Sequence, residues 1–388
     1  MASLSNGKKM SMKNSVVHSN YYPGLEVLRG VAACLVVIHH AYDLSNSQST
    51  RFGWLFESFG STGVIVFFVL SAFLLSTGLL RTGGKSIKKF YIRRFFRIAP
   101  AYYFVVIVLY VFFASPANIY SRQGFWQSIA NLLFLQLFSP DTVSNLNVNG
   151  ALWTLSIEAI LYFALPFIIF LVSRRSWISI SLFFTTGYVF RILVQHGIFN
   201  EIYFHKHVLQ PNQMLYIQQQ FLGWLPIFCG GISIAVVFLN RPPTLQIQFR
   251  TWYLVFLFLP TIAVSKVVFS SSSSSSLWFT NYDIIIGLTV TAMIYILASF
   301  NGINTSIASK VGLYLGQRSY GIYLWHFPIL LSVFARGPQE SAHFSYSLPQ
   351  RLVIAIVLIF IFAEISYRFV EIPMINRGKQ IIQRLSKS

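Results

Sequence analysis

The chain has 388 residues, of which 55% are hydrophobic, 17% are aromatic and only 10% are charged. Soluble domains carry about 25% charged residues, so this composition excludes an ordinary soluble protein and predicts a polytopic membrane protein. The formal net charge is +19, but the lysines and arginines cluster at the ends of apolar runs rather than on one polar face. That placement is typical of membrane topology, and we expect contact with anionic membrane lipids and not with nucleic acid.

The apolar runs predict ten membrane-spanning helices, because about 20 apolar residues are needed to cross a bilayer. The predicted spans are residues 24–44, 61–80, 98–114, 152–172, 177–195, 219–239, 252–269, 280–299, 313–334 and 350–371. Residues 125–138 are also apolar but are too short to cross. We interpret that segment as an interfacial or re-entrant helix.

The distribution of positive charge predicts the orientation of the bundle. Ten spans place both termini on one side, together with the basic loop over 81–97, Arg174, Arg175 and the basic C-terminal residues. Because lysine and arginine accumulate on the cytoplasmic side, we expect both termini in the cytoplasm. The chain is thus divided into a mobile cytoplasmic tail over 1–20, one membrane domain over 21–374, and a basic cytoplasmic tail over 375–388.

Two ionisable residues inside the first span are candidates for a functional site. Arg29 and His40 are eleven positions apart, so they share one helix face and lie about 16 Å apart along the axis. His39 points about 100° away from that face, which favours a packing role for it. Ionisable groups at membrane depth are costly and usually functional, so we select His40 rather than His39.

Three later spans also carry polar faces, which we expect to meet in one interior chamber because they cannot face lipid. Their members are Thr154, Glu158 and Tyr162 on one span, Ser319, Tyr323 and His326 on the second, and Glu364, Tyr367, Arg368 and Glu371 on the third. Structural roles are the alternative: Glu158, Arg368 and Glu371 can pair with charged neighbours and staple helices, and His326 can bond a carbonyl group freed by Pro328.

Five segments occur in a fixed order: LRGVAACLVVIHH, GVIVFFVLSAFLL, FYIRRFFRIAPAYY, ALWTLSIEAILYFALP and SYGIYLWHFPI. Together they resemble the motifs of the membrane-bound acyltransferase-3 family, which O-acylates sugars and related acceptors. The match includes an arginine, ten residues and then a histidine, which again selects His40. Ala72 departs from the pattern, since glycine is usual there, and this affects only packing.

The resemblance implies a ten-span enzyme that moves an acyl group, with acetyl the commonest, from acetyl-CoA to a sugar hydroxyl of a cell-surface or exported glycan. It implies a bacterial plasma membrane location and no metal ion. Some relatives add a soluble SGNH esterase-like domain. We expect none here, so the chain either acts alone or hands an acyl group to a separate glycan-modifying protein.

The chemistry suggests roles for the matched residues. A sugar hydroxyl needs a base to take its proton, and we expect His40 to be that base or a transient acyl carrier, oriented by Glu158 or Asp43. We expect Arg94 and Arg97, with Arg29, to bind the phosphates or the arm of CoA. The residues expected to bind substrate or to support the site are Ser71, Trp153, Ser319, Tyr323, His326 and Glu364.

A secondary transporter or flippase for a glycan or an anionic solute is the main alternative, because it would also need intramembrane charges around a polar chamber. That alternative does not explain why the histidine, the arginine-rich junction and the glutamate occur as one set. The sequence leaves open the identity of the acceptor and which carboxylate reaches His40.

Overall fold

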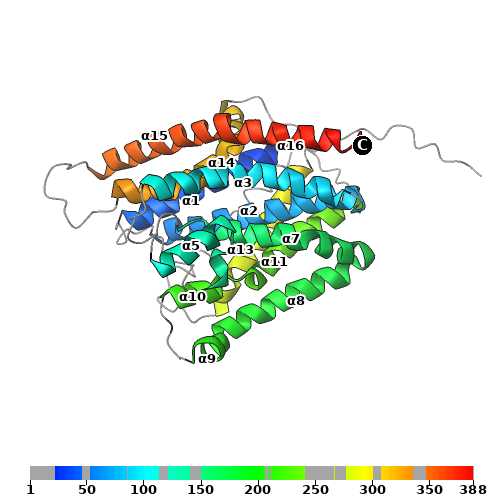
Figure 1. The fold of residues 1–388 in the computed structure, drawn as a ribbon. Helices are drawn as coiled ribbons and strands as arrows, with labels where there is room; N and C mark the ends of the chain where they lie inside the picture. The colour runs from blue at the N-terminus through cyan, green and yellow to red at the C-terminus, as the bar shows by residue number, and fades with distance from the viewer. Residues whose placement is uncertain are drawn as a thin grey trace, which may run out of the picture.

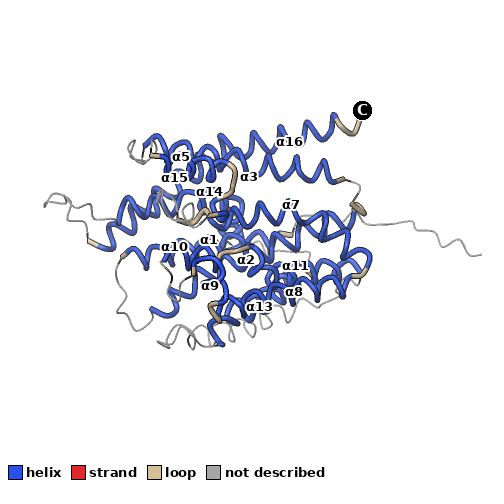
Figure 2. The backbone as a smooth tube through the Cα atoms, turned by 60° about the horizontal axis from the view of Figure 1, so that its bottom comes forward, coloured by secondary structure: helices blue, strands red, loops and turns tan. Residues whose placement is uncertain are grey.

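The fold was analysed in a computed structural model, which describes residues 22–45, 53–84, 86–112, 121–139, 150–205, 209, 211–240, 266, 277–299, 307–334 and 347–387. Long helices lie side by side through the molecule (Figure 1). Within the described ranges, the backbone forms helices and no strand (Figure 2). The prediction of an all-α membrane protein is confirmed.

Among the described residues, nine helices are close to the length of a membrane span or longer: α1 (Pro23–Leu44), α2 (Gly53–Arg81), α3 (Ile87–Phe112), α7 (Trp153–Arg174), α8 (Ser176–Gln195), α11 (Phe221–Asn240), α13 (Leu277–Ala298), α14 (Ile307–Phe334) and α15 (Leu348–Ser366). Four pieces are short: α5 (Arg122–Leu132), η1 (Gln136–Phe138), α9 (Ile198–Phe204) and α10 (Pro211–Gln218). After α15, the chain continues through a π-helical turn, η3 (Tyr367–Glu371), into α16 (Ile372–Arg384).

Eight of the described helical segments are long and apolar enough to cross a membrane. The predicted span 313–334 corresponds to α14, which is not among the eight. The predicted span 252–269 lies outside the described residues apart from Lys266. The count of ten spans and the cytoplasmic location of the termini therefore stay predictions.

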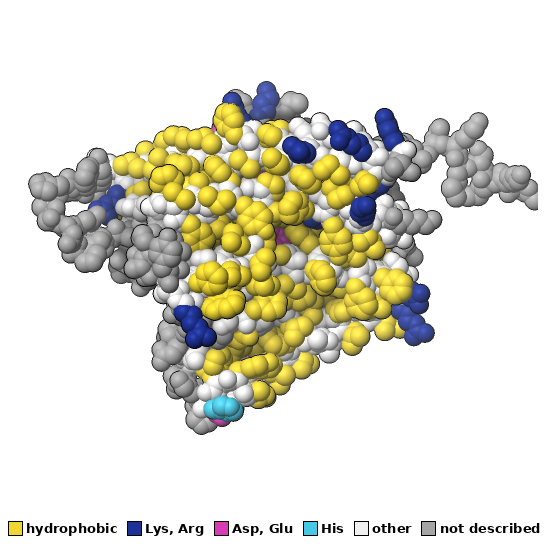
Figure 3. Space-filling model, in the orientation of Figure 1, with side chains coloured by type: hydrophobic (Ala, Val, Ile, Leu, Met, Phe, Trp, Pro, Cys, Tyr) yellow, Lys and Arg dark blue, Asp and Glu magenta, His cyan; other side chains and the backbone are white. Residues whose placement is uncertain are grey.

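Large apolar side chains cover much of the surface (Figure 3). Phe163, Phe369 and Phe112 are 79%, 73% and 75% exposed. A soluble monomer rarely exposes contiguous apolar surface on this scale, whereas lipid tails solvate it without cost. On the face shown in Figure 3, most lysine and arginine side chains lie toward the end where α16 finishes.

Two side-chain hydrogen bonds show which helix ends lie together. Arg81, at the end of α2, donates to the Tyr22 hydroxyl just before α1, over 3.4 Å. Lys89, near the start of α3, donates to Ser386 Oγ after α16, over 2.7 Å. These basic ends form the side that the charge distribution assigns to the cytoplasm. Residues 375–384, predicted as a tail, are part of α16, which packs on α3.

The segment 125–138 is built from two short pieces. α5 has 11 residues, which is about 16 Å of helix and too short to cross a bilayer. The chain then turns at Phe134, whose φ is 59°. Tyr102 on α3 donates to the Asn131 carbonyl over 2.6 Å and accepts from Gln136 over 3.0 Å. These bonds fix the segment to the bundle as a short, non-spanning element.

α1 packs most extensively on α14 and α2. Gly30 and Gly316 lie at the α1–α14 crossing, and a Cβ atom added to Gly316 would overlap the carbonyl oxygen of Glu26. Small residues let membrane helices approach to backbone contact. This close crossing determines which residues of α1 and α14 meet further along the pair.

Candidate functional site

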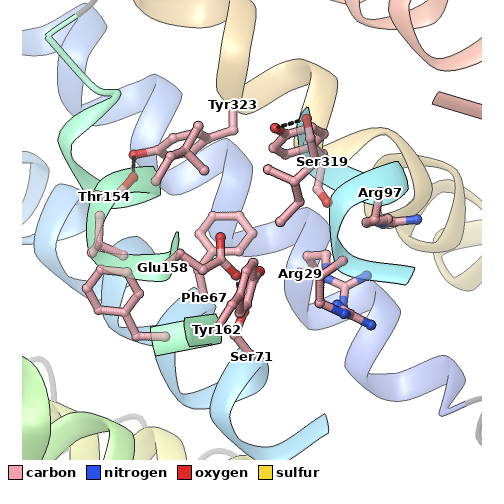
Figure 4. A pocket seen from close by; sticks show the side chains of 15 residues that line it. Arg29, Phe67, Ser71, Arg97, Thr154, Glu158, Tyr162, Ser319 and Tyr323 are labelled. Atoms are coloured by element: carbon pink, nitrogen blue, oxygen red, sulfur yellow. Dashed lines mark hydrogen bonds between the residues drawn. The ribbon is translucent and has the colours of Figure 1, made fainter. Parts of the chain in front are cut away.

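A cavity of roughly 700 Å³, counted to its open mouth, lies among α1, α2, α3, α7 and α14. Its lining is Arg29, Val64, Phe67, Phe68, Ser71, Arg94, Arg97, Ile98, Thr154, Leu155, Glu158, Tyr162, Ser319, Tyr320 and Tyr323. In Figure 4, Arg29 and Arg97 lie on one side of the space, while Thr154, Glu158 and Tyr162 lie opposite on α7. A polar chamber is thus present, with cations facing a carboxylate and hydroxyl groups, but the predicted third polar face, from Glu364 to Glu371, is not part of its lining.

The three arginines of the cavity differ in their partners. Arg29 pairs with Glu26 one turn earlier, with an Nη1–Oε2 distance of 3.1 Å. The Arg94 guanidinium lies 6.0 Å from the centre of the Tyr162 ring, and its Nε is buried without a hydrogen-bond partner. Arg97 makes no ion pair with any residue of the described part of the chain. The cavity therefore has guanidinium N–H groups available for an anionic ligand.

The carboxylate of Glu158 accepts a hydrogen bond from the Ser71 hydroxyl over 2.5 Å, joining α7 to α2. Both residues line the cavity, and Tyr162 lies one turn further along α7. Figure 4 shows Glu158, Ser71 and Tyr162 grouped on one side of the space. The predicted helix face of Thr154, Glu158 and Tyr162 is therefore the face that α7 presents to the cavity.

The hydroxyl groups of Thr154 and Tyr323 lie 2.6 Å apart, and Tyr323 also donates to the Ala151 carbonyl over 2.9 Å. These bonds tie α14 to the beginning of α7. Both side chains are nearly fully buried. Both residues line the cavity, and the Tyr323 ring lies 5.4 Å from the ring of His326, one turn further along α14.

His326 is fully buried, and its Nδ1 donates to the Tyr323 carbonyl over 2.7 Å. Because a carbonyl oxygen only accepts, that nitrogen carries the hydrogen and Nε2 is left without a described partner. The His326 ring stacks on the His40 ring with a centroid distance of 5.3 Å. Phe327 packs on His40 from another side at 5.1 Å. The carbonyl freed by Pro328 is that of Leu324, so His326 does not compensate for the proline.

The structure brings seven predicted site residues into the cavity wall: Arg29, Ser71, Arg94, Arg97, Glu158, Ser319 and Tyr323. His40 and His326 are not in that wall but form the stacked pair beside Tyr323. Among described residues, His40 Nδ1 is buried without a hydrogen-bond partner, and no hydrogen bond joins His40 to Asp43 or Glu158. The expected carboxylate contact to His40 is therefore not formed in this structure.

Three other predicted residues lie outside the cavity. Asp43 is exposed at the end of α1, and Trp153 packs on Trp224 with ring centroids 5.6 Å apart. Glu364 pairs with Arg318 and Arg368. Stapling by ion pairs is the alternative for Glu158, Arg368 and Glu371. Arg368 does pair, with Glu364, whereas neither Glu158 nor Glu371 forms an ion pair within the described residues.

Sequence reasoning missed several residues. Glu26, the partner of Arg29, stands three positions before it, and that i, i+3 spacing could have identified it. Tyr320 lines the cavity and lies inside the SYGIY segment. Arg191 and Asp283 form an ion pair of 2.6 Å between α8 and α13. Each is a lone charge in an apolar span, which is itself a signal of a buried partner. No group of three histidine, cysteine or acidic side chains suited to a metal lies within the described ranges.

An acyltransferase domain model matches residues 22–368. The chain belongs to the acyltransferase-3 family. This match confirms the family suggested by the five segments, and it covers every helix that lines the cavity.

The chain is similar to peptidoglycan O-acetyltransferase OatA of Listeria monocytogenes, with 26% identity over 95% of this chain and 58% of that protein. It is 27% identical to O-acetyltransferase OatA of Staphylococcus aureus strain NCTC 8325, over 95% of this chain and 59% of that protein. A putative O-acetyltransferase, SACOL0978 of S. aureus strain COL, is also 27% identical, over 92% and 58%. The chain thus spans less than two thirds of these relatives. No solved structure matches it.

Proposed function

We propose that this protein O-acetylates a glycan of the bacterial cell envelope, taking the acetyl group from acetyl-CoA. The observation that carries the proposal is an arginine-lined cavity with a stacked histidine pair beside Tyr323 of its wall. The relatives are named as O-acetyltransferases, which supports the reaction class, and the Listeria protein supports peptidoglycan as the first acceptor to test.

The arginines suit the phosphate groups of the donor. Guanidinium groups bind phosphate through two parallel N–H···O bonds, and Arg94 and Arg97 have N–H groups without described partners. Arg29 lies about 16 Å from His40 along α1. A donor with its phosphates at the arginines would extend its thioester arm past Glu158 and Tyr323 toward the histidines.

His40 is the proposed general base. Its imidazole takes the proton of the sugar hydroxyl, the hydroxyl oxygen attacks the thioester carbonyl carbon, and the carbon–sulfur bond breaks. The departing thiolate then takes the proton back from the imidazolium, so CoA leaves as a thiol. His326, stacked on His40 and fixed through its Nδ1–H, holds the His40 ring in place.

The basic helix ends around Arg81 and Lys89 support donor entry from the cytoplasm and acceptor access from the other side of the plasma membrane. The donor then never has to cross the bilayer. Only the acetyl group does.

Kinetics in membranes with radiolabelled acetyl-CoA test both halves of the site. Arg94→Ala is expected to raise the KM for acetyl-CoA about 10-fold or more, with a smaller change in the KM for the acceptor. His40→Ala is expected to lower kcat by about 100-fold or more. Arg377→Ala, which removes an exposed charge on α16, is the control. Unchanged transfer by the His40→Ala protein would reject His40 as the base.

A glycan transporter would give a different result. Wild-type protein in liposomes would then move the glycan across the bilayer without releasing CoA. Release of CoA that requires the acceptor supports acyl transfer, and mass spectrometry of cell-wall glycans for a lost acetyl mass identifies the acceptor.

A further inference from the structure

Glu371, on the π-helical turn η3, is 1% exposed. Neither of its carboxylate oxygens has a hydrogen-bond partner among the described residues. A buried carboxyl group without a partner is costly, and such groups persist where the surrounding protein uses them. π-helical turns are rare and also concentrate at functional sites.

The surroundings of Glu371 place it behind the wall of the cavity. The η3 turn packs on α3, the helix that carries Arg97. On α14, Gly321 leaves the space that the carboxyl group occupies, since an added Cβ atom there would lie 3.2 Å from Glu371 Oε1. Arg97 and Arg318 are the cations whose charges act on the carboxyl group, although neither forms a hydrogen bond or an ion pair with it among the described residues.

Arg318 is already committed to another carboxylate. Its guanidinium forms two hydrogen bonds with Glu364, one of them between Nη2 and Oε1 at 3.1 Å. It also lies over the rings of Tyr314 and Tyr367, at 3.7 Å and 4.5 Å. Arg97 has no such partner in the described part of the chain. Of the two cations, Arg97 is therefore the one whose charge Glu371 can balance.

Arg97 itself lines the cavity, as does Tyr320. Tyr320 donates to the carbonyl of Ile98 over 2.9 Å, which fixes α14 beside the Arg97 backbone. A guanidinium has five N–H donors in a rigid fork, so one edge can face a carboxylate while the other binds a phosphate. Arg97 thus lines the cavity from the helix on which the turn carrying Glu371 packs.

We propose that Glu371 is a positioning residue for donor recognition: its carboxylate orients the Arg97 guanidinium so that the free N–H groups face the donor phosphates in the cavity. This inference rests on the proposed function and assigns a residue to it that lies beyond the span of the family match, 22–368. The π-helical turn is what separates Glu371 from the Glu364–Arg368 pair and turns it toward α3.

The test compares two donors, acetyl-CoA and acetyl-pantetheine, which lacks the nucleotide and its phosphates. Glu371→Gln keeps the side-chain shape and removes the negative charge. It is expected to raise the KM for acetyl-CoA about 10-fold, to leave kcat within about 2-fold, and to leave the KM for acetyl-pantetheine unchanged. Arg97→Ala should show the same split, and the double variant should be no worse than Arg97→Ala alone, because coupled residues are not additive.

Glu201→Gln, which neutralises an exposed carboxylate on α9, is the matched control. Glu371→Asp retracts the carboxylate by one methylene group and is expected to raise the KM for acetyl-CoA about 3-fold. This variant carries the test if Glu371→Gln does not accumulate in membranes.

Three outcomes overturn the inference: an unchanged KM for acetyl-CoA in both Glu371 variants, an equal loss with both donors, or additive effects in the double variant. Failure of the proposed function would look different. In that case wild-type protein itself would not prefer acetyl-CoA to acetyl-pantetheine.

Discussion

His326 stacks on His40 with 5.3 Å between the ring centroids, and the two rings come from opposite ends of the chain. The Nδ1 of His326 is fixed by the Tyr323 carbonyl, while Nδ1 of His40 and Nε2 of His326 are buried without described partners. Among the described residues, the ionisable group beside the proposed base His40 is thus the imidazole of His326 and not the expected carboxylate of Glu158 or Asp43.

Replacing His326 tests this arrangement. His326→Ala removes the ring that supports His40, so we expect kcat to fall about 100-fold while the KM for acetyl-CoA changes little. His196→Ala is the control, since His196 is exposed at the C-terminal end of α8, outside the cavity and the histidine pair. We expect it to retain activity within about 5-fold. Equal losses in the two variants would argue against a specific role for His326.

The hydroxyl pair of Thr154 and Tyr323 should contribute to stability. Thr154→Val removes one hydroxyl and leaves Tyr323 with a weaker set of partners, so we expect a loss of about 1 to 2 kcal/mol in the free energy of unfolding. Thr154→Ser keeps the hydroxyl and is the control. Thermal unfolding in detergent measures both, and equal melting temperatures for the two variants would contradict the expectation.

Replacing glycine by alanine should have opposite effects on stability at the α1–α14 crossing and at an open position of α2. At Gly316 an added methyl group overlaps the Glu26 carbonyl, whereas at Gly78 it meets nothing within 4 Å. Gly316→Ala is expected to destabilise the protein by about 1 to 3 kcal/mol and to reduce acyl transfer by moving His326 away from His40. Gly78→Ala is expected to be neutral or to stabilise by up to about 1 kcal/mol. Unfolding curves and transfer rates of both variants check this pair.

The ion pair of Arg191 and Asp283 lies outside the cavity and joins α8 to α13 at 2.6 Å. Asp283→Ala leaves a largely buried guanidinium that keeps its bond to the Gly223 carbonyl but has lost its carboxylate, so we expect a loss of about 3 kcal/mol. The double variant Arg191→Leu/Asp283→Leu removes both charges and should recover most of that loss. A double variant less stable than Asp283→Ala would show that the pair contributes more than mutual neutralisation.

The positions of the long helices were predictable because the length of each apolar run determines where a helix can span the membrane. The first span was predicted over 24–44 and is Pro23–Leu44, and the fifth was predicted over 177–195 and is Ser176–Gln195. Polar helix ends were harder. α2 begins at Gly53, before the apolar run at 61, and the last helix continues into α16, because packing on neighbouring helices extends a helix beyond its apolar part.

Within the site, helical phase correctly placed Arg29 and Glu158 in one cavity. Both side chains face the interior because exposing a charged group to lipid costs free energy. Phase alone could not pair His40 with His326, because that contact depends on the crossing of α1 and α14. Helical phase also gave a wrong result for Glu364 and Glu371. They are seven residues apart and were expected on one face, but Glu364 forms ion pairs and Glu371 is buried without a partner among the described residues. The π-helical turn between them changes the phase, and no local sequence rule predicts such a turn.

The continuous segment Leu348–Arg384 has 37 residues, about 55 Å of helix, whereas the hydrocarbon core of a bilayer is about 30 Å thick. Much of this helix must therefore lie outside the hydrocarbon core. There α16 packs against the first half of α3. Arg94 and Arg97 belong to that half of α3. The charged nucleotide of the proposed donor would then bind at the depth of the lipid headgroups, among water and ions. Only its uncharged arm would extend into the hydrocarbon core.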